Sequence, residues 1–292
     1  MEPIKLAQAV GAPAALSLII LVLGHRAWRR GDPGRPATGA TNALAITAAL
    51  VLAFILMGLW QGVWASDAAR RIPLVTAVVL AAELVARLSA RPRVAIAARI
   101  AATVLVLAAL AHPYLRFTIW PRRFGLWMPG LGVALLAWWL SIDRLGARER
   151  GIRLPILLWM TASAASVLLL LGAHSQMFAL LAASVAAGVG GVVVLAAWRP
   201  RISSEGAAAA AAALLGSLVL LGALGGDQPW WMTVWIAASV AALPFTVVVA
   251  RLPLVARLRP WKATLICLLA AVAIVAPVII VAYRAYTAVN RY

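Results

Sequence analysis

The sequence predicts an all-α, polytopic membrane protein: a transmembrane helical bundle of about ten spans that forms one integral membrane domain over residues 1–292. Composition is the first reason, because 65% of the residues are hydrophobic and 12% are charged, whereas a soluble domain carries about 25% charged residues. The mean hydropathy of +0.99 agrees with a chain surrounded mostly by lipid. The third reason is ten apolar stretches of roughly 17–23 residues, the length that an α-helix needs to cross the hydrocarbon layer.

Each apolar stretch corresponds to one expected helix. Within a bilayer every backbone N–H must find a partner in its own segment, so each stretch is predicted to be a helix. The third stretch is short for a crossing. The expected spans are residues 9–23, 43–65, 72–86, 94–111, 124–142, 154–172, 177–198, 206–224, 230–250 and 264–286.

The basic residues predict the orientation. The loops after the first, third, fifth, seventh and ninth spans hold 18 of the 26 Lys and Arg residues. Since loops rich in Lys and Arg stay in the cytoplasm, both termini are predicted to lie outside. The richness in Ala, Arg and Val suggests a bacterial plasma (inner) membrane. The net charge of +18 is thereby explained by orientation, and we expect no nucleic-acid partner.

Ionisable residues inside spans are the first candidates for function, and Glu83 is the clearest of them. Arg87 follows four residues later, which is the favourable spacing for an ion pair within one helix. Two interpretations are open: a structural pair near the inner end of the third span, or a site for a proton or cation.

A second set of polar residues falls at the predicted outer ends of the spans. Asp67, Asp227, His112 and His174 belong to it and form a possible ion site. Ordinary solvated loop residues explain the set best. No spacing typical of metal or haem ligands is present, so we expect neither a metal nor another cofactor.

The loop after the fourth span mixes aromatic and basic residues. Aromatic rings beside guanidinium groups suit contact with lipid phosphates, or docking to an acidic partner on the outer face. The residues that define this candidate contact are Arg116, Trp120, Arg122 and Arg123.

Helix-breaking residues inside spans are the usual sequence signal of a transport site. The candidates are Pro129, Pro244 and Pro277. A transporter would place a water-filled cavity between the fifth, ninth and tenth spans, near these prolines. Ten spans also divide into five plus five, as in an inverted repeat, although the two halves show no convincing similarity in sequence.

Three functions remain open. The first is a secondary transporter or permease for a small solute. The second is a non-catalytic accessory or scaffold subunit of a larger membrane complex, which the scarcity of buried polar residues favours. The third is a membrane-embedded enzyme acting on lipid-linked substrates through Asp67 and Asp227. The expected partners are membrane lipids, and other membrane subunits or further copies of the chain.

Overall fold

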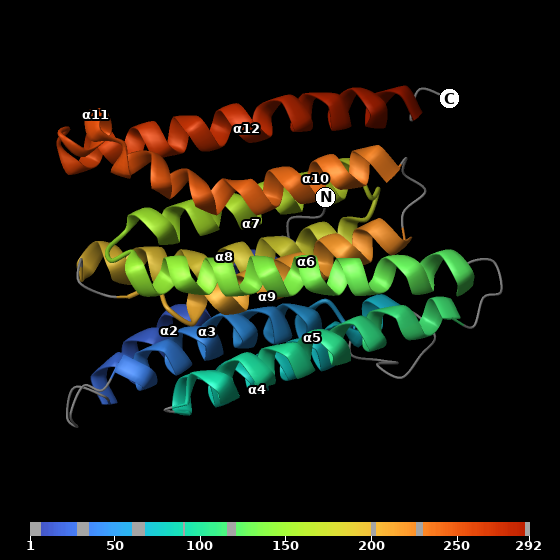
Figure 1. The fold of residues 1–292 in the computed structure, drawn as a ribbon, viewed down its shortest axis with the longest axis horizontal. Helices are drawn as coiled ribbons and strands as arrows, with labels where there is room; N and C mark the ends of the chain where they lie inside the picture. The colour runs from blue at the N-terminus through green and yellow to red at the C-terminus, as the bar shows by residue number, and fades with distance from the viewer. Residues whose placement is uncertain are drawn as a thin grey trace.

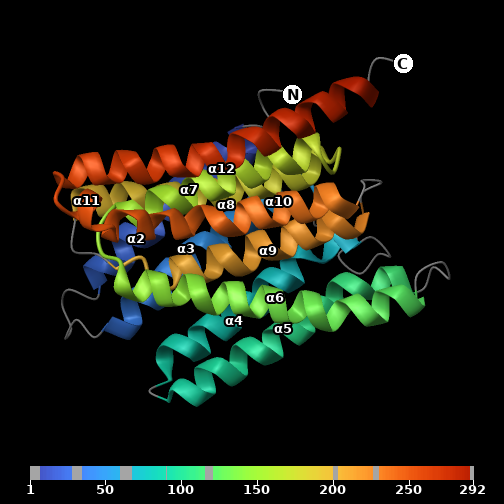
Figure 2. The same ribbon diagram turned by 45° about the horizontal axis from the view of Figure 1, so that its top comes forward.

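The computed structural model is a bundle of long helices, and it describes residues 7–27, 35–59, 68–89, 91–115, 121–199, 203–225 and 230–289. Within these ranges there are helices and turns but no β-strand, and two extended residues, Arg150 and Ser203, form an isolated bridge. Figures 1 and 2 show the rods lying side by side along the long axis of the molecule. The predicted all-α bundle is confirmed.

The helices follow the order of the apolar stretches. Short π- and 3-10 segments precede α2 and α4 and follow α10. The elements are η1 (Ala7–Gly11), α2 (Ala12–Ala27), α3 (Arg35–Leu56), η2 (Ala68–Arg71), α4 (Ile72–Leu88), α5 (Pro92–Leu115), α6 (Pro121–Arg148), α7 (Arg153–Leu171), α8 (Gln176–Trp198), α9 (Ala207–Gly225), α10 (Trp230–Ala242), η3 (Leu243–Arg251), α11 (Pro253–Ala256) and α12 (Pro260–Val289).

Six helical segments are long and apolar enough to cross a membrane, against the ten that the sequence predicts. Two other apolar helices, in α2 and α9, are shorter, and α4 has 17 residues. The other four expected spans fall in α2, α4, α6 and α9; three of these have too few apolar residues in a row, and α6 is long but not among the six. The six segments are residues 38–56, 92–112, 153–171, 176–198, 231–251 and 260–288. Several long apolar helices are compatible with a multi-pass membrane protein.

Successive helices run in opposite directions, so two ends of the bundle can be distinguished. At one end α6 finishes and α9 begins, and the Ser203 hydroxyl, just before α9, donates to the Gly146 carbonyl at 3.2 Å. Arg153, at the start of α7, donates to Thr264 near the start of α12. We call this the basic end, because Arg144 and Arg148 of α6, Arg251 of η3, and Arg257 and Arg259 before α12 lie there. At the opposite end the His174 ring, between α7 and α8, stacks on Tyr286 of α12 with ring centroids 5.2 Å apart.

Helices α8 and α9 form the centre of the bundle. In α9 the alanine run from Ala207 to Ala213 is at most 1% exposed, so this stretch is packed against other helices on all sides. Gly188 of α8 lets α3 approach, and its carbonyl accepts a hydrogen bond from Ser17 of α2 at 2.8 Å. Small residues at helix contacts are the usual means of close packing between apolar helices. In contrast, α12 lies along one edge of the bundle (Figure 1), with 22% of its apolar segment buried.

The helix contacts differ between the two halves of the chain. Helix α7 packs against α8, α12 and η3, whereas α2, its counterpart in an inverted repeat of five plus five helices, packs against α3 and α8.

Candidate functional site

Glu83 lies in the last third of α4 and is completely buried. The Arg87 guanidinium donates to its Oε2 atom at 3.2 and 3.3 Å, so the ion pair expected from the four-residue spacing is present. The Trp139 indole of α6 donates to Oε1 at 2.9 Å. Burial of a carboxylate requires several donors of this kind, because an unpaired charge away from water is very costly.

Arg99 of α5 is the second cation at Glu83. It donates to Oε1 at 2.8 Å and to Oε2 at 3.1 Å, and its side chain is 5% exposed. The count of basic residues in cytoplasmic loops includes Arg99, although the expected span 94–111 contains it. The structure places Arg99 inside the apolar helix segment, bound to Glu83, so it does not belong to a loop.

Two further carboxylates complete the cluster. Asp143 of α6 accepts from Arg99 at 2.7 Å and also from Arg87. Glu205, in the turn before α9, accepts from Arg87 at 2.6 Å. We call Glu83, Arg87, Arg99, Asp143 and Glu205 the charge network. It joins α4, α5, α6 and the start of α9 at the basic end.

Exposure changes across the charge network from its core to its edge. The Glu83 side chain is fully buried, Asp143 is 15% exposed and Glu205 is 28% exposed. Three carboxylates face two guanidiniums, and Arg87 bonds to all three. The network therefore has a dry core at Glu83 and reaches water at Glu205.

Backbone contacts hold Glu205 in place. The Asn42 amide of α3 donates to the carbonyls of Ser203 and Glu205, each at 3.1 Å. Gly206 has φ +78°, and a Cβ atom there would lie 2.0 Å from the Gly39 carbonyl oxygen. Only glycine fits both this conformation and this close approach. The turn is thus clamped against α3 immediately beside Arg87.

Sequence reasoning located only part of this site. Glu83 and Arg87 are four residues apart and were detectable. Asp143 and Glu205 lie 56 and 118 residues from Arg87, so their contacts depend on the packing of the helices. The available signal was weak: Arg99 and Asp143 each lie inside or next to an apolar stretch on the predicted inner side.

The polar residues expected at the outer side are not brought together where the structure describes them. His112 is exposed at the end of α5, and its Nδ1 atom lies 3.0 Å from an Arg71 guanidinium nitrogen. His174 adopts φ 49° and stacks on Tyr286. Within the described residues no group of three His, Cys, Asp or Glu has a geometry suited to a metal ion. Asp67 and Asp227 lie outside the described residues.

The candidate lipid or partner contact falls mainly outside the described part of the chain. Arg116 and Trp120 are not described, and Arg122 and Arg123 lie in the first turn of α6. The three prolines are separated from one another. Pro129 and Pro277 are exposed within continuous helices, whereas Pro244 is buried where α10 changes into the 3-10 segment η3.

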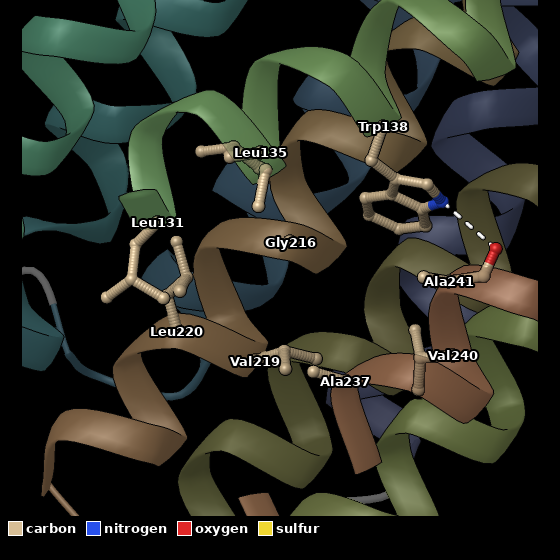
Figure 3. A pocket seen from close by; sticks show the side chains of 10 residues that line it. Leu131, Leu135, Trp138, Gly216, Val219, Leu220, Ala237, Val240 and Ala241 are labelled. Carbon is tan, nitrogen blue, oxygen red and sulfur yellow. Dashed lines mark hydrogen bonds between the residues drawn. The ribbon is translucent and has the colours of Figure 1, made fainter. Parts of the chain in front are cut away.

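An apolar groove of about 150 Å³ lies between α6, α9 and α10 (Figure 3). Leu135 and Trp138 line one side, Val219 and Leu220 a second, and Ala237 a third. The Trp138 indole donates to the Ala241 carbonyl at 3.2 Å, so its polar atom is satisfied. The expected cavity between α6, α10 and α12 would be water-filled and close to the prolines, whereas this groove is apolar, includes α9 and has no proline in its lining.

No family model, curated protein or solved structure matches the chain.

Proposed function

We propose that the chain is a secondary transporter or permease of a small solute, in which the charge network closes the basic end of the bundle. The single observation that carries this proposal is a set of five charged residues, fully buried at Glu83 and nearly so at Arg99, that ties four elements together at the basic end. Charged groups within membrane helices are expensive and typically belong to ion or solute pathways. Ion pairs are also reversible contacts, which suits an end that must open and close.

The distribution of contacts supports a closed basic end. There the charge network and the Gly206 clamp join α3, α4, α5, α6 and α9. At the opposite end the contacts within the described residues include the stacking of His174 on Tyr286 and the hydrogen bonds from Arg71 to His112 and to the Ala109 carbonyl. Under this proposal the basic end faces the cytoplasm of a bacterium, ten helices cross the inner membrane, and both termini lie outside.

The test is solute flux in proteoliposomes that contain the purified chain. A panel of radiolabelled amino acids, sugars and organic cations is screened with an imposed membrane potential or pH gradient. Uptake of one class, altered in Glu83→Gln and unaltered in Glu149→Gln, supports the proposal. Glu149 is a matched control, because it also pairs with an arginine at the basic end but belongs to a separate, more exposed pair.

The second candidate is a scaffold subunit of a larger membrane complex. Its support is the apolar character of the groove and the dense packing of α8 and α9, since a solute pathway usually retains several polar groups. This candidate predicts no flux of any solute in the panel. It also predicts that crosslinking in native membranes, followed by purification, recovers a partner at fixed stoichiometry. A monomer that transports would exclude it.

A further inference from the structure

We infer that the groove between α6, α9 and α10 binds one acyl chain of an anionic phospholipid, whose headgroup lies on the arginines at the basic end. The inference does not depend on transport, because a bound lipid suits a permease and a scaffold equally. The groove is half-open, lies along the middle of three apolar helices, and is lined by side chains without a free polar group.

The lining decides between water and an apolar occupant. A buried water needs two to four polar partners, whereas an apolar space of about this size stays dry and takes up apolar molecules. The one indole N–H at the groove already donates to Ala241. The flexible chain of a membrane lipid is the most abundant apolar molecule around such a protein, and it regains the dispersion contacts that an empty groove would lose.

A glycine creates part of this space. A Cβ atom at Gly216 would lie 2.4 Å from Leu135 and 3.2 Å from Trp138. The absence of that side chain leaves both large side chains in place along one wall, with the groove between them and α10 (Figure 3).

Charge decides which lipid fits. Glu149 directly follows the last residue of α6, eleven residues beyond Trp138, and it accepts from Arg251 of η3, so this pair lies at the basic end of two elements that flank the groove. Exposed cations are numerous at this end of α6, η3 and α12 in the described part of the chain: Arg148, Arg150, Arg251, Arg257, Arg259 and Lys262. Guanidinium groups bind phosphate through charge-assisted, often bidentate hydrogen bonds.

The test is native mass spectrometry of the delipidated chain with an equimolar mixture of phosphatidylglycerol and phosphatidylcholine of identical chains. We expect retained phosphatidylglycerol on the unmodified protein. Each basic residue near a headgroup contributes about a fivefold preference. The variants Arg148→Gln and Arg251→Gln should therefore each weaken phosphatidylglycerol retention by about that factor and leave phosphatidylcholine unchanged.

A groove-filling variant tests the position of the chain. Ala237→Phe occupies the groove and should remove the bound lipid, whereas Val133→Phe, at a position of α6 that is 69% exposed, should not. Equal retention of phosphatidylglycerol and phosphatidylcholine by the unmodified protein overturns the inference. Equal retention of phosphatidylglycerol by the two phenylalanine variants overturns it as well. If Ala237→Phe does not fold, phosphatidylglycerol with brominated acyl chains tests the same point. It should quench the tryptophan fluorescence of the unmodified protein by a larger fraction than that of Trp138→Phe. Equal fractional quenching of the two proteins contradicts the proposal.

Discussion

Replacement of Glu83 by glutamine tests the energetic role of the charge network. Glu83 is completely buried and accepts five hydrogen bonds, two each from Arg87 and Arg99 and one from Trp139. Glutamine keeps the shape of the side chain but removes its charge. Its amide has only one accepting oxygen, because the other terminal group is an NH₂ that donates. The arginine and tryptophan donors on that side therefore lose their acceptor. Removal of one partner from a buried ion pair costs about 3–5 kcal/mol. Because Arg87 and Arg99 keep their bonds to Asp143 and Glu205, we expect the lower end of this range, about 3 kcal/mol.

Glu149→Gln is the matched control for this prediction. Its partner Arg251 is 48% exposed, so the pair is screened by water and its loss costs about 0–1 kcal/mol. The assay is reversible unfolding of the purified protein in mixed micelles, with helix content followed by circular dichroism. A loss of free energy of unfolding in Glu83→Gln that is no larger than in Glu149→Gln would refute the reasoning.

Three further predictions concern the two-acceptor binding by the Arg99 guanidinium, the close approach of Gly206 to α3, and the orientation of the chain in the membrane. Arg99→Lys keeps the charge but cannot hold Glu83 and Asp143 at once, so unfolding in mixed micelles should show a loss of about 1.5–3 kcal/mol, and unchanged stability would contradict the bidentate geometry. Gly206→Ala should destabilise by at least about 1–3 kcal/mol in thermal unfolding, while Gly130→Ala, whose Cβ meets nothing within 4 Å, should be neutral or slightly stabilising. A tag fused to the C-terminus should be accessible to a protease added to intact cells, and protection of the tag would reverse the proposed orientation.

Hydropathy predicted most of the architecture, because the apolar stretches are the helices. It could not separate a crossing helix from a shorter apolar one: α2 and α9 are apolar yet short, and burial at the centre of the bundle produces the same composition as burial in lipid. The alanine run in α9 illustrates this, since protein surrounds it on all sides.

The candidate site was predicted only as far as local spacing reaches. Glu83 and Arg87 lie on one helix four residues apart, so their pairing follows from helix geometry alone. The bonds from Arg99 to Glu83, and from Arg87 to Glu205, depend on how helices pack, and no sequence pattern records that. Counting arginines by loop also treated Arg99 as an orientation signal, although its partner lies on the neighbouring helix. The prolines do not point to this groove, because it owes its space to Gly216 and to small residues on α10.

The central claim is that the charge network holds the basic end closed, and a distance measured across that end tests it most directly. Spin labels are placed at Arg91→Cys, before α5, and at Arg150→Cys, after α6, with Cys267 replaced by alanine. Pulsed electron resonance in lipid nanodiscs then compares this protein with its Glu83→Gln and Glu149→Gln derivatives. We predict that Glu83→Gln adds a population with a longer distance and that Glu149→Gln does not. The same single distance distribution in all three proteins would contradict the account.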